Sequence, residues 1–173
     1  MRAAVVIPVR NGAAFLGPCL RALLDQQGAD FTTIAVDNGS SDGSADLVAA
    51  DFPGVRLIRN DRPLGFAGAV NVGIRAALAG GEPPEAIVLL NQDTVAHPGW
   101  LAALLAPLER DSQVGVAGCK ALFPNGHIQH AGAEILWPLG YGRNRGYDAR
   151  DDGQLDAEDS PAYVAFVGVA LVV

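Results

Sequence analysis

The sequence predicts an α/β domain, a three-layer sandwich built around a mostly parallel central sheet. Short aliphatic runs alternate four times with segments of helical periodicity, which is the pattern of right-handed βαβ units. Hydrophobic residues make up 50% of the chain but aromatic residues only 6%, as expected for buried strands rich in Val, Leu and Ala. Three of the aliphatic runs end abruptly in polar side chains, which predicts a binding site at one edge of the sheet.

Each predicted element follows from its local pattern. The predicted strands are aliphatic runs bounded by turn-forming residues: Ala3–Val9, Phe31–Val36, Val55–Arg59, Ile87–Leu90 and Val114–Cys119. The predicted helices have apolar residues at helical spacing or follow N-cap residue types: Phe15–Leu24, Ala45–Phe52, a segment from Gly65 to about Gly80, and Trp100–Leu108. Because a helix separates each strand from the next, neighbouring strands are expected to run parallel.

The pattern changes from about Ala121 onwards. Ile135–Trp137 predicts one short strand, whereas 138–161 is rich in glycine and charged residues and predicts a mobile loop near the functional face. Tyr163–Val173 is apolar again, and the sequence stops inside this run. We therefore expect a domain that is truncated at its C-terminus.

Composition argues against several classes of protein. The 173 residues suffice for one domain with a substantial core, and 12 basic against 19 acidic residues give a net charge of −7, which opposes binding to nucleic acid. Cys19 and Cys119 have no C-x-x-C spacing, so we expect buried thiols and neither a metal site nor a disulfide. No apolar run reaches the roughly 18 residues of a membrane span, and no signal peptide precedes the first strand, so we expect a cytoplasmic protein.

The clearest functional signal is the tripeptide Asn91-Gln92-Asp93, which directly follows the buried run Ile87–Leu90. Asn91 and Asp93 lie two residues apart, so in an extended chain both side chains face the same side. One carboxylate and one amide oxygen form a suitable seat for a hard divalent cation that keeps several waters. The alternative is a polar turn in which Asp93 caps the next helix. The surrounding strands decide between the two interpretations.

Two other predicted strands end in polar residues of the same kind. Pro8-Val9-Arg10 closes the first strand, and Asp37-Asn38 begins a run without apolar side chains after the second. A carboxylate at the second strand can accept a hydrogen bond from a base imide or a ribose hydroxyl, and a cation at the fourth can bind a diphosphate. Together the three clusters predict a crevice for a nucleoside diphosphate.

Four segments within about the first 120 residues carry a resemblance to a known family. They are Val6-Ile7-Pro8-Val9-Arg10-Asn11, Val36 to Ser44, Asn60 with Gly65 to Gly73, and Leu89 to Thr94. In these segments the sequence resembles the family 2 glycosyltransferases of the GT-A fold, in particular the rhamnosyltransferase-like branch. The resemblance implies a Rossmann-like GT-A fold, with residues 1–120 as the nucleotide-sugar-binding region and 121–173 as the start of an acceptor-side region in the same domain.

The resemblance also implies roles for individual residues. Those implied to bind the donor are Pro8, Val9, Arg10, Asp37, Asn38, Asp42, Asn71, Asn91, Gln92 and Asp93. Asp37 would bind the pyrimidine base, and Asn91-Gln92-Asp93 stands where the family has its D-x-D motif. Asp93 is the implied ligand of Mg²⁺ or Mn²⁺. Asn91 replaces the first aspartate of the motif, so weak metal binding is expected.

The implied reaction is an inverting transfer of a sugar from a nucleoside diphosphate donor, dTDP-rhamnose or a UDP-sugar, to a hydroxyl of a cell-surface glycan or its lipid-linked precursor. The family's general base is expected beyond Val173, and Glu158-Asp159 is interpreted instead as part of a solvated acidic loop. Two alternatives are a nucleotide-sugar-binding module without catalysis and a sugar nucleotidyltransferase. The implied location is the cytoplasm or the inner face of the cell membrane, with peripheral membrane association.

Overall fold

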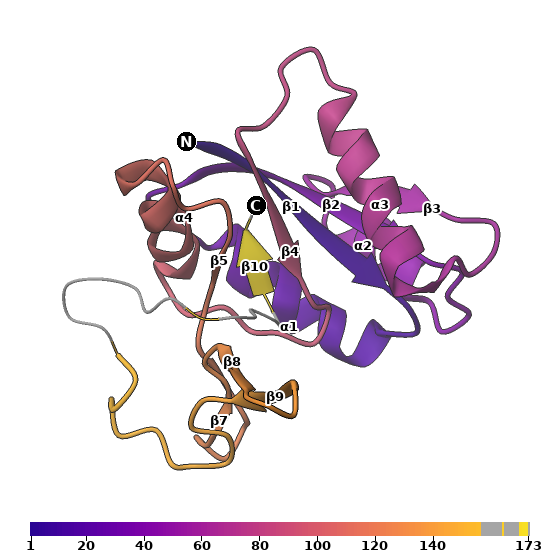
Figure 1. Cartoon of the computed structure of the whole chain (residues 1–173). Coiled ribbons are helices and arrows are strands. Elements are labelled where there is room, and N and C mark those ends of the chain that lie inside the picture. The colour runs from indigo at the N-terminus through magenta and orange to yellow at the C-terminus, as the bar shows by residue number, and fades with distance from the viewer. Residues whose placement is uncertain (157–163, 165–169, 173) are drawn as a thin grey trace.

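The computed structural model describes residues 1–156, 164 and 170–172. Its helices are α1 (Ala13–Leu24), α2 (Ser44–Asp51), α3 (Gly65–Leu78) and α4 (Trp100–Arg110). Its strands are β1 (Arg2–Val9), β2 (Asp30–Asp37), β3 (Arg56–Arg59), β4 (Ala86–Leu90), β5 (Ala117–Gly118), β6 (Ala121–Leu122), β7 (Ile128–His130), β8 (Ala133–Leu136), β9 (Tyr141–Asn144) and β10 (Ala170–Val172). Figure 1 shows these elements along the chain.

The central sheet has six strands in the order β3-β2-β1-β4-β10-β5. Strand β1 pairs in parallel with β2 on one side and with β4 on the other, and β2 pairs in parallel with β3. Strand β10 is antiparallel to both of its neighbours, β4 and β5. The sheet is thus mostly parallel, and the carboxyl ends of β1, β2 and β4 lie side by side at one edge.

Helices cover both faces of this sheet, which confirms the predicted three-layer sandwich (Figure 1). Alternate residues of a strand point to opposite faces. On β1, the side chains of Val5 and Ile7 pack with α1, α2 and α4, whereas Val6 packs on the other face with α3. The central strands are aliphatic on both faces because both faces are buried, which explains their continuous apolar runs.

Helix α1 is held against the sheet by one apolar stripe. Leu16, Leu20 and Leu23 are fully buried and recur at helical spacing. Full burial of such a side chain contributes about 1.5–3 kcal/mol. The amino-terminal end of α1 is thereby fixed close to the carboxyl end of β1, where the polar residues lie.

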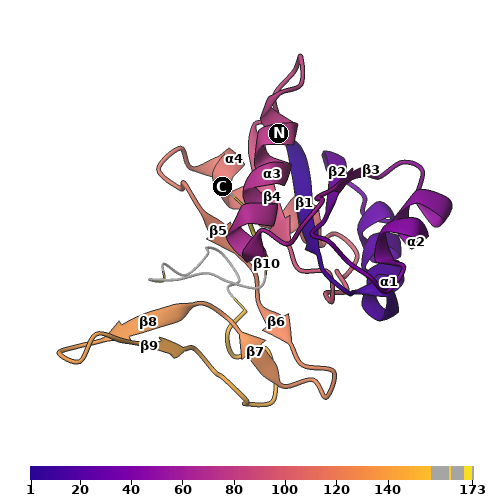
Figure 2. The ribbon, with the colours of Figure 1, turned by 90° about the vertical axis from the view of Figure 1, so that its right-hand side faces the viewer.

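The region after α4 differs from the sequence prediction in two respects. The strand expected over Val114–Cys119 is reduced to β5, two residues at the far edge of the sheet. The loop expected over 138–161 contains strand β9, which pairs with β8 in an antiparallel hairpin, and residues 157–161 lie outside the described part. In Figure 2 this hairpin projects away from the sheet, on the side toward which β1 points.

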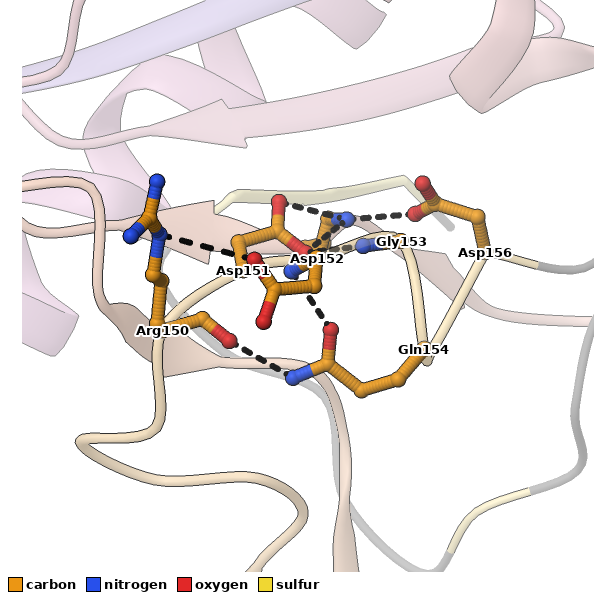
Figure 3. Close-up of polar contacts among 7 residues, drawn as sticks. Arg150, Asp151, Asp152, Gly153, Gln154 and Asp156 are labelled. Carbon is orange, nitrogen blue, oxygen red and sulfur yellow. Dashed lines mark hydrogen bonds and ion pairs between the residues drawn. The ribbon is translucent and has the colours of Figure 1, made fainter.

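The loop that follows the hairpin is tied to the domain by a lysine. Lys120 forms ion pairs with Asp151, at 2.8 Å, and with Asp156. Within the loop, Gln154 donates a hydrogen bond to the backbone oxygen of Arg150 at 2.7 Å (Figure 3). These bonds hold the chain in place after it leaves β9.

Among the residues that the structure describes, no helix is both long enough and apolar enough to cross a bilayer.

Candidate functional site

A pocket of about 550 Å³ opens at the carboxyl edge of the parallel strands. It is lined by Pro8, Val9, Arg10, Asn38, Pro63, Gly65, Phe66, Asn91, Gln92 and Asp93. These residues come from the ends of β1, β2 and β4 and from the segment that begins α3. The loops expected to meet at one edge of the sheet therefore do meet there.

Seven of the ten residues predicted to bind the donor line this pocket: Pro8, Val9, Arg10, Asn38, Asn91, Gln92 and Asp93. The other three, Asp37, Asp42 and Asn71, are not among the lining residues. Asn71 lies exposed on α3. The roles of all ten in binding remain predictions.

Gln92 joins the end of β4 to the end of β1. Its Oε1 accepts a hydrogen bond from the backbone N–H of Arg10 at 2.9 Å, and its Nε2 donates one to the backbone oxygen of Arg10 at 3.1 Å. Gly12 makes room for this contact, because a Cβ built there would lie 2.3 Å from Oε1 of Gln92. Gln92 thus fixes the backbone of the first loop, a role that the sequence prediction did not include.

The Arg10 side chain reaches across the pocket to the second strand. Its Nη1 donates a hydrogen bond to the backbone oxygen of Asn38 at 2.8 Å. Within the described part of the chain no carboxylate forms an ion pair with Arg10. A positive charge without an ionic partner therefore lies in the pocket, where it can attract a phosphate.

Asn38 is buried and joins the end of β2 to the segment between β3 and α3. Its Nδ2 donates to the backbone oxygen of Gly65 at 3.1 Å, and its Oδ1 accepts from the backbone N–H of Leu64 at 2.9 Å and from Nδ2 of Asn60 at 3.2 Å. The side chain therefore positions the segment that enters α3.

Asp37 lies beside the pocket and is almost completely buried, with 5% of its surface exposed. Its carboxylate accepts weak hydrogen bonds from the backbone N–H of Ser40 at 3.3 and 3.4 Å. Its backbone oxygen accepts a hydrogen bond from the N–H of Asn60 at 2.8 Å. Since the bonds to the carboxylate are long, its oxygens retain capacity to accept from a ligand.

The carboxylate of Asp42, in the loop before α2, contacts the first residue of α1. Its Oδ2 accepts a hydrogen bond from the backbone N–H of Ala13 at 2.9 Å, and its Oδ1 accepts from both the hydroxyl and the N–H of Ser44. The hydrogen bond from the Ser44 hydroxyl is the largest cause, and that from Ala13 the second, of a pKa lowered below the ordinary value of 3.8. Asp42 therefore links the first two loops through its charged form.

Asn91 and Asp93 present oxygen atoms that no neighbour occupies. Among the described residues, no hydrogen bond or ion pair involves either side chain, and Asp93 is exposed at the pocket. The alternative that Asp93 caps the next helix is wrong, since Gly99 is the N-cap residue of α4 and no side chain caps it. The described residues contain no group of three or more His, Cys, Asp or Glu side chains that could hold a metal by themselves. The pair fits a hard cation that takes its remaining ligands from water and phosphate.

The thiol of Cys19, on α1, contacts the loop that contains Asn91 and Asp93. Its Sγ donates a hydrogen bond to the backbone oxygen of Asn91 at 3.6 Å. Burial raises the pKa of this thiol to about 12. The thiol is therefore protonated at neutral pH and able to donate, as expected for a buried cysteine without a reactive role.

Three lining residues were not predicted from the sequence: Pro63, Gly65 and Phe66. Phe66 is 62% exposed and sits in the first turn of α3. An exposed aromatic residue at a pocket can stack on a ring of a ligand. The available signal was the glycine-rich start of this helix, which supported the resemblance but was not included in the site.

The fold belongs to the GT-A glycosyltransferases. A mannosyltransferase from Pyrobaculum calidifontis, solved in complex with GDP-Man and Mn²⁺, superposes with a TM-score of 0.60 at 22% identity over 71% of this chain and 36% of its own. TarS 1-349 of S. aureus in complex with UDP-GlcNAc superposes with a TM-score of 0.61 at 18% identity over 73% of this chain and 36% of its own.

The family follows from the sequence match. The Glycosyl transferase family 2 pattern matches residues 4–152, and the chain belongs to this family. The N-acetylglucosaminyl-diphospho-decaprenol L-rhamnosyltransferase of Mycobacterium tuberculosis is 32% identical over 103 residues, which are 56% of this chain and 34% of the relative. The O-antigen biosynthesis protein RfbC of Myxococcus xanthus is 28% identical over 138 residues, 78% of this chain and 10% of the relative. The matches extend over only 10% to 40% of the first curated relatives.

Proposed function

We propose that the chain binds a nucleoside diphosphate sugar, dTDP-rhamnose or a UDP-sugar, and supplies the donor half of a site that transfers the sugar with inversion to an acceptor hydroxyl. One observation carries the proposal: a pocket at the carboxyl edge of the parallel strands contains a cation, Arg10, and a carboxylate, Asp93, neither of which forms an ion pair with a described residue. A donor with a diphosphate and a bound metal matches this combination of charges.

The metal would be held by Asp93, with Asn91 as the second protein oxygen. When bound, Mg²⁺ or Mn²⁺ offsets the negative charge that develops on the departing diphosphate. A single carboxylate gives a weak site in the absence of nucleotide, because the phosphates supply further ligands. Metal and nucleotide are therefore expected to bind cooperatively.

The protein's own residues would orient the nucleotide. The Asp37 carboxylate can accept from the imide N–H of a uracil or thymine base, a ring donor that the pairing edge of adenine lacks. The Arg10 guanidinium would lie near the phosphates, on a backbone fixed by Gln92. Phe66, at the pocket wall, would limit the space beside the base or the sugar. These groups favour a pyrimidine nucleotide.

The acceptor side is proposed from the relatives. A relative named as a rhamnosyltransferase acting on N-acetylglucosaminyl-diphospho-decaprenol supports a lipid-linked glycan as acceptor, and one named for O-antigen biosynthesis supports a cell-surface polysaccharide as product. The general base that deprotonates the acceptor hydroxyl is expected beyond Val173.

Isothermal titration with UDP, dTDP and GDP, each with and without Mn²⁺, tests the donor proposal. We expect UDP and dTDP to bind more tightly than GDP, and Mn²⁺ to strengthen binding by at least about tenfold, equivalent to about 1.4 kcal/mol. Failure of all three nucleotides to bind in the presence of Mn²⁺ would refute the proposal. Turnover of dTDP-rhamnose by a chain extended beyond Val173 would then separate an enzyme from a binding module.

A further inference from the structure

Gln26 follows the last turn of α1 and is almost completely buried, with 8% of its surface exposed. Its Nε2 donates hydrogen bonds to the backbone oxygens of Ala22 at 3.1 Å and of His97 at 2.9 Å. Its Oε1 accepts a hydrogen bond from the backbone N–H of Leu101 at 3.0 Å. Because the partners are two carbonyl oxygens and one N–H, a single orientation of the carboxamide satisfies all three. Gln26 therefore joins the end of α1 to the segment between β4 and α4.

The bond to Leu101 has a structural role at the start of α4. Gly99 is the N-cap residue of this helix and provides no side chain to cap it. Leu101 is the second helical residue, and its N–H is one of those that an N-cap side chain ordinarily accepts from. Oε1 of Gln26 supplies this acceptor from another part of the chain. Capping requires only an acceptor, so it does not account for the bond that Nε2 donates to His97.

The bond to His97 holds the far end of the loop that carries Asn91 and Asp93. At the near end, Sγ of Cys19 donates to the backbone oxygen of Asn91 at 3.6 Å, and the N–H of Thr94 donates to the same oxygen at 3.2 Å. The side chain of Asp93 itself forms no hydrogen bond or ion pair with a described residue. Its position therefore depends on how the backbone on either side of it is held.

Much of the loop beyond Asp93 faces solvent. Val95 is 63% exposed and residues 97–99 are exposed as well, whereas Ala96 is buried. Exposed backbone of this kind opens locally at a small cost in free energy. A hydrogen bond from a buried side chain restricts such opening, because breaking it leaves a buried polar group without a partner. The bond from Gln26 is thus placed to limit the motion of this loop.

We propose that Gln26 is a positioning residue: by holding His97 it fixes the loop that presents the Asp93 carboxylate at the pocket. The consequence for metal binding rests on the proposed donor site, in which Asp93 is the metal ligand. A site with a single carboxylate has few other groups to hold the ion, and a loop that must be ordered on binding loses affinity. Gln26 is not among the described residues that line the pocket, so it would act through the loop alone.

Two substitutions separate the positioning role from the capping role. Gln26→Glu keeps an acceptor for Leu101, and a carboxylate is favoured at the start of a helix, but it has no N–H to donate to His97. Gln26→Met has a similar length and removes both interactions. Gln27→Glu and Gln27→Met, at the exposed neighbouring glutamine, are the matched controls.

Hydrogen–deuterium exchange at neutral pH tests whether Gln26 holds the loop. In both Gln26 variants the amides of residues 91–98 should exchange about tenfold faster or more, whereas those of β1 should keep the parental rate. Parental exchange of the loop in Gln26→Glu would show that Gln26 only caps α4, and would overturn the proposal. An equal increase over the whole chain would also overturn it, because it would indicate a general loss of stability.

Titration of UDP or dTDP with and without Mn²⁺ tests the consequence for the site. Gln26→Glu should reduce the strengthening by Mn²⁺ at least about threefold and leave the affinity without metal nearly unchanged. The parental ratio in this variant would overturn the role in metal binding. If Mn²⁺ has no effect on the parent, the donor proposal fails, and hydrogen exchange alone decides whether Gln26 positions the loop.

Discussion

Gln92 and Arg10 come from different strands and are joined by two hydrogen bonds, both made by the Gln92 carboxamide to the Arg10 backbone. The contact requires a donor and an acceptor on one side chain, so neither glutamate nor leucine can replace it. By fixing the backbone of Arg10, the contact limits the positions that the Arg10 guanidinium can reach.

Replacement of Gln92 by alanine is expected to weaken binding of a pyrimidine nucleoside diphosphate by roughly tenfold, since two hydrogen bonds of about 1 kcal/mol each no longer hold the first loop. Isothermal titration measures the change. Gln27→Ala removes an exposed glutamine outside the pocket and should leave the affinity unchanged. Parental affinity in Gln92→Ala would show that the contact does not position the site.

Asp93→Asn should abolish most of the strengthening that Mn²⁺ gives to nucleotide binding. The variant keeps the size of the side chain but removes the one carboxylate among the described residues that line the pocket. Titration of UDP or dTDP with and without Mn²⁺ gives the ratio of the two affinities, which should approach one. Asp25→Asn, an exposed aspartate after α1, is the control. A ratio like that of the parent would show that Asp93 is not a metal ligand.

The charged form of Asp42 should stabilise the fold above acidic pH. Its pKa in the folded state is lowered, chiefly by the hydrogen bond from Ser44 and then by that from Ala13, relative to the ordinary value of 3.8. The stabilisation is thus fully present above that value and is lost as the pH falls through the lower folded pKa. Urea unfolding between pH 6 and about pH 3 should show a shallower acid dependence for Asp42→Asn than for the parent. Identical slopes would contradict this assignment.

Gly73→Ala should destabilise the protein although alanine is the better helix former. A Cβ at Gly73 would lie 2.3 Å from Cγ1 of Val6 and 3.1 Å from Cγ2 of Val36, both on buried strands. Overpacking of this kind costs about 1–3 kcal/mol. Thermal unfolding should show the loss as a reduced Tm. Gly54→Ala, where the new Cβ meets no atom within 4 Å, should have little effect.

The sequence predicted the first four strands from their short aliphatic runs, and all four described helices from helical spacing of apolar residues or from N-cap residue types. Val5, Val6 and Ile7 are apolar for the reason first inferred, burial on both faces of the sheet. Strand β5 has two residues and its strand neighbour in the sheet is β10, so its position depends on a distant pairing that no local pattern records. The four residues of strand β9 are all exposed, so the strand has no buried face and no alternating apolar pattern from which it could have been predicted.

The location of the candidate site was also predictable from the sequence, because polar residues directly follow the buried strands. The contacts that individual residues make inside the site were not predictable. That Gln92 binds the backbone of Arg10 depends on the missing side chain of Gly12, contributed by another part of the chain. Pro63 and Phe66 enter the pocket because Asn38 bonds the segment between them, a contact that only the folded structure brings about.

Strand β10 fills the place between β4 and β5, although Leu90 and Ala170, which pair with each other, are separated by 170 − 90 = 80 positions. The described residues that line the pocket all precede position 94. During translation, at about 5–20 residues per second, these residues are therefore synthesised roughly 4–16 s before β4 receives its second neighbour. Throughout that interval β4 has no strand partner on one side, and the bare amide and carbonyl groups of such an edge can pair with another chain.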